Sequence, residues 1–493
     1  MLSLFMAAVE VTVVATAMPS IVNHLGGLAR YSWVFSAYMV ASTTTIPLYG
    51  KFSDIYGRRP VFLVAMAFFL AGSILSGQSH SMDQLIGFRA LQGLGAGGLV
   101  PLSFIIIGDM FSFEKRARMQ GLFSGVWGVA SIVGPLLGGF LVDQLSWRWV
   151  FYVNVLPGFL ATGLLWVGWR EAPRAEAGAS SEEKTISAIQ PRGAGSEDRA
   201  RPQIDYLGAT LLTAGVVVLL LSLFQLGTLP GWALLASSVM LFVALLAVER
   251  AATDPILPLP LFRDRLFAVG TAHGLLAGWA MFGSTSFVPL FVQVSLEKSA
   301  TVAGSALTPL MLGWVFASII GSRLLLHFSY RSIVLVGMSS LTVGSLFMSL
   351  VTTDTTLARV MFNLALMGVG MGLTVPAFTI AVQNSVDRKQ LGTATATLQF
   401  SRVIGGALGV SVMGLILSLR LSANLKAAGG DGAAMSLQDF MRPLHAGTAV
   451  ADATWRGALT GAVESVFVAA LAAAVVGLVV TVFTPRTGVG RSE

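Results

Sequence analysis

The stretch GKFSDIYGRRPV, residues 50–61, lies between two long apolar runs and decides how the rest of the sequence is interpreted. Its two glycines allow a tight turn. Asp54 can accept hydrogen bonds from the N-terminus of a following or neighbouring helix. Arg58 and Arg59 can pair with acids on a neighbouring element or with lipid headgroups. The stretch therefore predicts an ionic contact at the ends of helices that cross a membrane.

The composition supports a membrane protein, because 55% of the 493 residues are hydrophobic and only 11% are charged. Ordinary soluble domains carry roughly a quarter charged residues. Apolar runs of about 20 residues are long enough to cross a bilayer, and the sequence contains fourteen such runs. Their approximate limits are 2–22, 33–50, 60–78, 84–108, 120–142, 149–169, 206–225, 231–249, 266–293, 301–322, 332–351, 357–381, 393–418 and 459–484.

The net charge of +7 reflects membrane topology rather than nucleic-acid binding. Of the 31 Lys and Arg, 21 lie in connections after even-numbered runs or in the C-terminal tail, seven lie on the other side and three lie inside runs. Cytoplasmic connections of membrane proteins are enriched in Lys and Arg. We therefore expect a multi-pass protein of the cytoplasmic (inner) membrane with both termini in the cytoplasm and no nucleic-acid partner.

The sequence contains no motif typical of an enzyme active site or a metal site. Cysteine is absent, which excludes disulfides and thiolate metal sites. The five histidines are scattered without the paired spacing of metal ligands. The sequence contains no P-loop, no H-E-x-x-H and no G-x-S-x-G. We therefore expect no cofactor, no metal and no enzymatic activity.

The sequence divides into four parts. Residues 170–205, rich in Ala, Gly, Ser, Glu and Arg, lack apolar periodicity and predict a cytoplasmic linker. The other parts are an N-terminal six-helix bundle (1–169), two inserted helices with their connector (206–265) and a C-terminal six-helix bundle (266–493). Within the last part, the polar stretch 422–456 is expected outside the membrane, with a short interfacial helix near residues 437–444.

An internal repeat relates the two bundles. Glycines and a proline at offsets 0, 2, 4 and 8 occur in the fourth run and again in the twelfth: Gly93, Gly95, Gly97 and Pro101 match Gly368, Gly370, Gly372 and Pro376. Gly121, Gly134 and Gly138 of the fifth run likewise match Gly392, Gly405 and Gly409 of the thirteenth. The repeat predicts two halves related by a pseudo-twofold axis along the membrane normal. Independent close packing of glycine-rich helices is the alternative.

The stretch at 50–61 resembles the G-x-x-x-D-x-x-G-R-R signature of the major facilitator superfamily. The resemblance implies an all-α membrane fold of two six-helix bundles, here with two inserted helices. We expect a cytoplasmic gate formed by Gly50, Asp54, Gly57, Arg58 and Arg59, with Asp109 and Glu114 as acidic partners. Topogenic positive charge alone would explain the arginines but not the aspartate and glycines. The equivalent loop of the second half, 321–331, lacks the aspartate, so the gate should be asymmetric.

The fifth run, GVWGVASIVGPLLGG at 125–139, resembles the antiporter motif of proton-coupled exporters in that superfamily. A glycine face with a proline kink would let the halves approach, whereas ordinary glycine packing is the alternative. With WRWVFYVNVLP at 147–157 and VEVTVVATAMPSI at 9–21, the chain is similar to the fourteen-spanner drug:proton antiporter family. The motif residues are Gly128, Gly134, Pro135, Gly138 and Gly139.

Glu10 and Arg89 are the residues expected to carry proton coupling. Glu10 stands in the middle of the first run, where that family usually has aspartate, and Thr12 and Thr16 are nearby. An intramembrane acid can take a proton from one side and release it to the other, unless it lies near a helix end in headgroup water. Arg89 opens RALQGLGAGG, which resembles a motif implicated in proton transfer. An isolated intramembrane arginine costs at least about 2.5 kcal/mol, so an acid or carbonyl partner is expected.

The substrate cavity is less well marked. Aromatic, Met and amide side chains can adapt to lipophilic guests, although aromatic residues in spans more often pack or face lipid. Arg402 is a further intramembrane arginine that needs a partner. The candidate cavity residues are Tyr38, Gln92, Trp127, Trp279, Phe282, Phe287, Met311, Trp314, Gln399 and Arg402.

Together these features favour a monomeric, proton-coupled exporter of lipophilic or cationic drug-like compounds, surrounded by membrane lipid and working by alternating access. The alternative is an exporter of the same fold for an endogenous solute such as a lipid, siderophore or secondary metabolite.

Overall fold

The computed structural model describes residues 1–26, 30–111, 113–168, 205–252, 255–257, 259–298, 300–427 and 453–486, and these residues form helices without a β-strand. The N-terminal half contains α1 (Leu2–Leu25), α2 (Tyr31–Tyr56), α3 (Arg58–Gly77), α4 (Met82–Met110), α5 (Phe113–Gln144), α6 (Trp149–Tyr152) and α7 (Val155–Gly168). The inserted hairpin is α9 (Tyr206–Phe224) and α10 (Leu229–Ala251), followed by the short η2 (Leu259–Arg263). The C-terminal half contains α11 (Arg265–Val294), α12 (Ala300–Ser305), α13 (Thr308–Leu324), α14 (Tyr330–Ser349), α15 (Leu357–Ser385), η3 (Arg388–Gln390), α16 (Leu391–Ala427) and α18 (Ala453–Val482).

Eleven helical segments in the described part of the chain are long and apolar enough to cross a membrane, so the chain is a multi-pass membrane protein. Helices α1, α2 and α5 coincide with the first, second and fifth predicted runs and have 24, 26 and 32 residues, but they are not among the eleven. The fourteen-span count therefore stays a prediction. Residues 169–204, which hold most of the predicted linker, and the predicted interfacial helix at 437–444 lie outside the described residues.

Two of the predicted runs are broken helices rather than continuous ones. The sixth run divides into α6 and α7, with Pro157 in the first turn of α7. The tenth divides into α12 and α13, with Pro309 in the first turn of α13. Proline has no N–H for the preceding turn and is best tolerated at a helix start, so each proline begins a new helix.

The thirteenth run is longer than predicted. It was expected to end near residue 418, but α16 continues to Ala427 and has 37 residues. At 1.5 Å per residue such a helix is about 55 Å long, well beyond the hydrocarbon core. Its last turns carry Asn424 and Lys426, polar residues that a helix accommodates once it has left the lipid.

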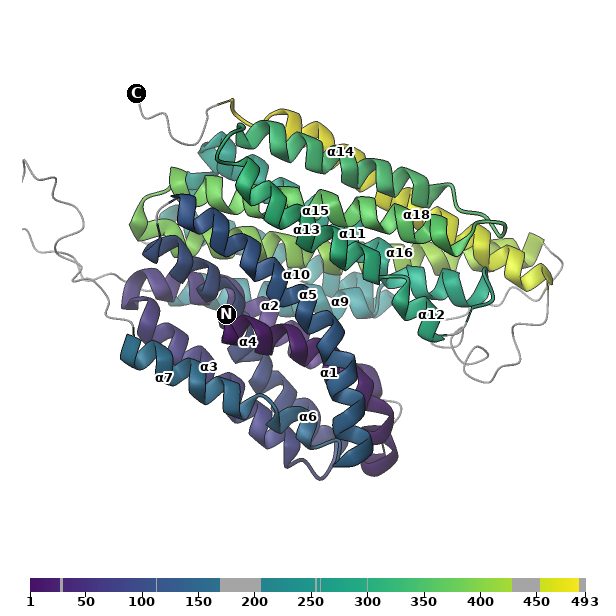
Figure 1. The fold of residues 1–493 in the computed structure, drawn as a ribbon, viewed down its shortest axis with the longest axis horizontal. Helices are drawn as coiled ribbons and strands as arrows, with labels where there is room; N and C mark the ends of the chain where they lie inside the picture. Colours follow the sequence, from purple (N-terminus) through teal and green to yellow (C-terminus); the bar gives the residue numbers. More distant parts are fainter. Residues whose placement is uncertain are drawn as a thin grey trace, which may run out of the picture.

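The two halves lie side by side with the inserted hairpin at their junction (Figure 1). The hairpin buries Leu212, Val216 and Leu220 in one apolar cluster with Ile404 of α16, and Val40 of α2 packs against the same cluster. The hairpin therefore contacts both halves. Packing of this kind rests on van der Waals contact, because lipid tails are as apolar as leucine.

Glycines at equivalent positions make equivalent helix contacts in the two halves. A Cβ added to Gly93 would overlap α2, and one added to Gly95 would overlap the backbone of α3. In the second half, Gly368 abuts α13 and Gly370 abuts α14, the counterparts of α2 and α3. Small residues let helix backbones approach closely in membranes. The sequence repeat is thus matched by a repeat in packing.

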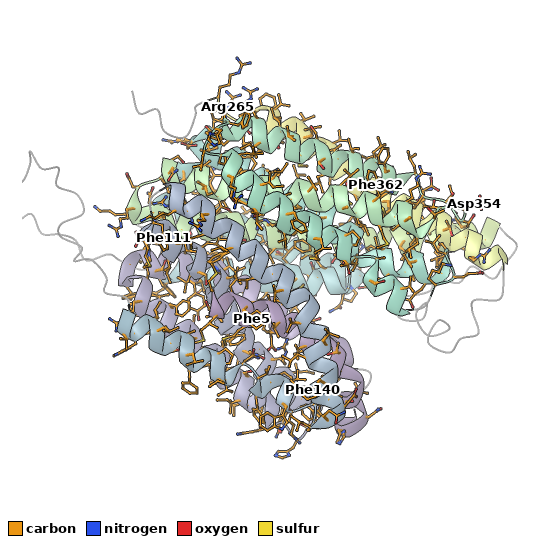
Figure 2. The ribbon with its side chains drawn as sticks, viewed as in Figure 1. Phe5, Phe111, Phe140, Arg265, Asp354 and Phe362 are labelled. Atoms are coloured by element: carbon orange, nitrogen blue, oxygen red, sulfur yellow. The ribbon has the colours of Figure 1, made fainter. Side chains whose placement is uncertain are left out.

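The halves meet mainly at one end, which we call the linker end because Gly168 and Asp205, the residues that flank 169–204, lie there with the turn between α2 and α3. Here α2 packs on α16 and α5 packs on α13. Toward the opposite end the halves diverge (Figure 1). Figure 2 labels Arg265 and Phe111 toward the linker end and Asp354 at the opposite end.

Gly95→Ala should lower thermal stability, because the new methyl would overlap the α3 backbone at Phe69 and Ala65. Overpacking of this kind costs about 1–3 kcal/mol. Gly87, on the same helix α4, has nothing within 4 Å of an added Cβ, so Gly87→Ala is the matched control and should be neutral or stabilising. Thermal unfolding of the purified protein followed by tryptophan fluorescence measures both. Equal midpoints for the two variants would contradict the close α3–α4 contact.

Candidate functional site

A buried ion pair joins α1 and α4 in the N-terminal half. The Arg89 Nη1 donates to Glu10 Oε1, and each residue is only 1% exposed. Arg89 also lies over the Tyr38 ring, 4.2 Å from its centroid, and its Nε is 3.4 Å from the Val34 carbonyl. Breaking a buried pair by removing one partner typically costs about 3–5 kcal/mol, because the other charge is left uncompensated.

The pair belongs to a closed ring of polar side chains that we call the Glu10 network: Glu10, Ser73, Arg89, Gln92 and Asn154. Arg89 Nη1 donates to Gln92 Oε1 at 2.7 Å, and Gln92 Nε2 is 3.3 Å from the Ser73 hydroxyl. Asn154 Nδ2 donates to Glu10 Oε2 and lies 3.2 Å from the same hydroxyl. Both oxygens of the carboxylate therefore have donors. All five side chains are buried.

Asn154 reaches Glu10 because the sixth run is broken. It lies between α6 and α7, two residues beyond Tyr152 and just before Val155. Its carbonyl accepts from the Gly158 N–H at 3.0 Å and so starts α7, while its amide group points to α1. The proline that begins α7 thus also places an amide donor inside the bundle.

The threonines near Glu10 serve packing rather than the carboxylate. Thr12 and Thr16 donate to the carbonyls of Val9 and Val13, at 2.9 and 2.7 Å. The Thr12 hydroxyl lies where a Cβ on Gly134 of α5 would be, and the Thr16 hydroxyl lies where a Cβ on Gly138 would be. The two glycines therefore allow α1 to pack closely against α5.

The antiporter-motif glycines therefore divide between two contacts. Gly128 faces Val315 of α13 in the other half, where an added Cβ would lie 2.7 Å from a methyl group. Gly134 and Gly138 face α1 of their own half, so the expected role of these two at the interface between halves is wrong in this conformation. Gly139 has nothing within 4 Å of an added Cβ, and the side chain of Pro135 lies outside the described residues.

A second cluster closes the linker end, and we call it the Asp54 latch: Asp54, Arg58, Asp109, Arg388, Gly392 and Thr393. Asp54 Oδ1 accepts from the Gly392 N–H at 2.9 Å, and Oδ2 accepts from the Thr393 N–H at 2.7 Å and its hydroxyl at 2.6 Å. These N–H groups belong to the first turn of α16, where a helix favours negative charge. Asp54 lies beyond the predicted run 33–50. Burial raises the pKa of its carboxyl, and Arg58 and Thr393 oppose that rise.

Two arginines extend the latch across the halves. Arg58 Nη1 donates to Asp54 at 2.5 Å, and Arg58 Nη2 donates to the Arg388 carbonyl at 3.2 Å. Arg388 Nε donates to Asp109 at 2.5 Å, and Arg58 Nε lies 3.7 Å from the other oxygen of that acid. Beside them, Arg116 Nη1 donates to Asn384 at 2.7 Å. The closed end is therefore held by charge-assisted bonds, which are stronger than neutral ones.

The remaining gate residues have other contacts. Gly57 has φ 98°, a conformation that L side chains rarely adopt, and it makes the turn between α2 and α3. An added Cβ on Gly50 would lie 2.9 Å from the Gly392 carbonyl oxygen, so this glycine lets α2 approach α16. Arg59 donates to the Trp166 carbonyl at 2.8 Å and stacks on that ring. The side chain of Glu114, on α5, lies outside the described residues.

The predicted cavity residues have different neighbours. Tyr38 and Gln92 border or join the Glu10 network. On α11, Trp279, Phe282 and Phe287 face Gly409, Gly406 and Gly414 of α16. Met311 and Trp314 pack on the apolar core of the C-terminal half, Trp127 is 40% exposed on α5, and Gln399 accepts from Arg402 at 2.9 Å. Among the described residues no group of three His, Cys, Asp or Glu could hold a metal ion.

Two helical halves that repeat the same packing, contact each other at one end and hold a buried acid within the first half define a secondary transporter fold. The chain belongs to the Major Facilitator Superfamily, which it matches over residues 1–410. It is 35% identical over 430 residues to the Multidrug transporter protein MdtP of Bacillus subtilis strain 168, covering 86% of this chain and 75% of that one. It is 35% identical over 509 residues to Multidrug resistance protein 3 of the same strain, covering 99% and 94%.

A solved structure shares this fold. The crystal structure of the human organic anion transporter MFSD10 aligns with a TM-score of 0.60, covering 96% of this chain and 97% of that one. The sequence identity is 16%, so the likeness concerns the fold alone.

Sequence reasoning missed the partners contributed by distant segments. Ser73 and Asn154 complete the Glu10 network, and Arg388, Gly392 and Thr393 complete the Asp54 latch. Asn154 carried one usable signal, because a single amide in an otherwise apolar run needs a buried partner. The sequence contains no comparable signal for the latch partners, since they lie more than 270 residues from the acids they contact.

Asn154 and Glu10 should be coupled energetically. A hydrogen bond to a charged group contributes about 1.5–3 kcal/mol, so a double-mutant cycle of Glu10→Met and Asn154→Leu should give a coupling energy of about 1–3 kcal/mol. The cycle is measured by equilibrium unfolding of the purified protein. Additive effects of the two substitutions would show that Asn154 does not bond Glu10.

Asp54→Asn should open the linker end more often. Because the native chain has no cysteine, a single thiol can report on this opening. Ala396→Cys, buried opposite Gly50, should react about tenfold faster with a water-soluble thiol reagent in the Asp54→Asn protein, since about 1.4 kcal/mol of lost hydrogen bonding changes a population tenfold. Ser332→Cys, exposed at the same end, is the control and should react equally in both proteins. Unchanged protection of Ala396→Cys would contradict the latch.

Proposed function

We propose that this protein is a proton-coupled exporter of lipophilic, drug-like compounds that works by alternating access. The observation that carries the proposal is the Glu10–Arg89 pair, which is buried inside the N-terminal half. The two halves of the protein contact each other mainly at the linker end. The names of the two Bacillus relatives, a multidrug transporter and a multidrug resistance protein, support drug-like substrates.

The coupling step follows from the ring of donors around Glu10. With the carboxylate charged, Arg89 and Asn154 hold both of its oxygens. A proton on Glu10 removes the charge and converts one acceptor into a donor, so both bonds weaken. The arginine is then without its counter-charge, which is costly in an apolar bundle. Protonation and a change in helix positions are therefore linked.

Helix α5 connects this step to the gate. One stretch of α5, at Gly134 and Gly138, seats α1, which carries Glu10. An earlier stretch, at Gly121 and Gly128, contacts α13 of the other half. A shift of α1 is thereby passed to the interface between halves, where release of the Asp54 latch would open the linker end. Interfaces of packed helices switch between discrete arrangements rather than deform continuously.

We infer that the linker end and both termini face the cytoplasm, in the cytoplasmic membrane. The excess of Lys and Arg on that side supports this orientation. The membrane potential can then drive export, because moving one charge through 100 mV is worth about 2.3 kcal/mol. The Glu10 network and the Asp54 latch lie within one chain, so we take the transport unit to be a monomer.

Glu10→Gln should abolish substrate-driven proton movement. In proteoliposomes, addition of a lipophilic dye should release protons from the native protein, and the response of the variant should fall to the background of empty vesicles, because the amide cannot carry a proton. Glu464→Gln is the matched control, since Glu464 is an exposed acid on α18 outside the network. A native response in Glu10→Gln would place coupling elsewhere, and no response in the native protein would favour an endogenous solute over drugs.

A further inference from the structure

Arg402 is an arginine within a predicted span that has no acid beside it among the described residues. It stands nine residues inside the predicted run 393–418, on α16. In the described part of the chain its polar partner is the Gln399 amide oxygen at 2.9 Å, and no carboxylate lies within ion-pair distance. Arginine has five N–H donors, so this single bond leaves most of its capacity for another acceptor.

The side chain lies on the inner face of α16. Thr395, Gln399 and Arg402 follow at helical spacing on one face of the helix. The Thr395 hydroxyl accepts from Gln383 of α15 at 3.2 Å, and Gln383 also donates to the Phe104 carbonyl of α4 at 3.3 Å. This face of α16 is therefore directed at the junction of the two halves. Arg402 is about two turns farther from the linker end than Thr395, and it is half-buried rather than sealed.

Glu10, Glu464 and His273 are other ionisable groups within the described spans, and their surroundings differ from those of Arg402. Glu10 has donors on both oxygens and Arg89 has Glu10, so the pair presents no free charge to a guest. Glu464 shares the outer stripe of α18 with the exposed Val468, Val475 and Val479. His273 is buried against Phe378 and beside Thr481. Of these groups in the described part of the chain, Arg402 is the one that is partly exposed on the inner face of its helix and has no counter-charge.

We propose that Arg402 binds an anionic group, such as a carboxylate or sulfonate, of an amphipathic substrate. The guanidinium matches the planar, two-oxygen geometry of these groups. In a low-dielectric site the ligand would supply the counter-charge that the protein does not. The inference rests on the proposed export function and narrows its substrate class from lipophilic, drug-like compounds to lipophilic anions.

Equilibrium binding tests the inference without requiring transport. The probes are pyrenebutyrate, a lipophilic carboxylate, and pyrenebutyramide, its neutral analogue, each titrated into the full-length protein in phosphatidylcholine nanodiscs with empty discs subtracted. Arg402→Gln should raise the Kd of pyrenebutyrate about tenfold or more, about 1.4 kcal/mol, and leave that of the amide within about twofold, because the amide makes no ion pair. Arg402→Lys keeps the charge but not the fork of donors, so its Kd for pyrenebutyrate should fall between those of the native protein and Arg402→Gln.

Other outcomes would overturn the inference. Equal weakening of both probes in Arg402→Gln would make the arginine a packing residue, and unchanged binding of pyrenebutyrate would place the anion elsewhere. Competition by phosphatidylglycerol that is lost in Arg402→Gln would assign the site to a lipid headgroup instead. Thermal unfolding of both variants checks that they are folded. Because this assay measures binding without proton movement, a failure of proton coupling in Glu10→Gln and a failure of anion binding in Arg402→Gln are separate results.

Discussion

The structure depends on how charges are satisfied inside an apolar bundle. Glu10 and Arg89 neutralise one another, and the neutral donors and acceptors around them fill the capacity that the ion pair leaves open. Because these groups come from α1, α3, α4 and the break between α6 and α7, one requirement fixes the relative positions of most of the N-terminal half. The same network makes the N-terminal half sensitive to protonation, since a single proton on Glu10 changes the number of donors and acceptors in the ring.

The two halves share a scaffold and differ in charge. Glycines in α4 and α15 bring equivalent neighbours into contact, and so do those in α5 and α16: Gly134 and Gly405 face α1 and α11 of their own halves, whereas Gly121 and Gly392 face the other half. Upon this symmetric packing the chain places an acid and its arginine in one half and a lone arginine in the other. The latch is asymmetric as well, because Asp54 of the first half is bound by the start of α16 in the second. The packing is therefore repeated between the halves, whereas the charged groups are not.

Much of this organisation could be predicted from local patterns. Apolar runs placed the helices, and the offset of Gly93 and Gly95 from Gly368 and Gly370 related the halves, because small residues mark close contacts wherever they occur. The chemistry of Asp54 suggested a helix N-terminus as its partner without identifying α16. Which distant side chain completes a polar cluster depends on the tertiary arrangement, and this is why Asn154 and Arg388 escaped notice. The contact of Gly134 with α1 escaped for the same reason.

The length of α16 has a mechanical consequence. One continuous helix begins at the Asp54 latch, passes Arg402 and continues beyond the hydrocarbon core to Ala427. A rigid rod held near one end acts as a lever, so a small tilt at Gly392 becomes a larger displacement at Lys426. If the Asp54 latch opens and closes, its movement would thereby reach the far end of α16 within a single element. A probe on the protruding tip would read out the state of the whole molecule from outside it.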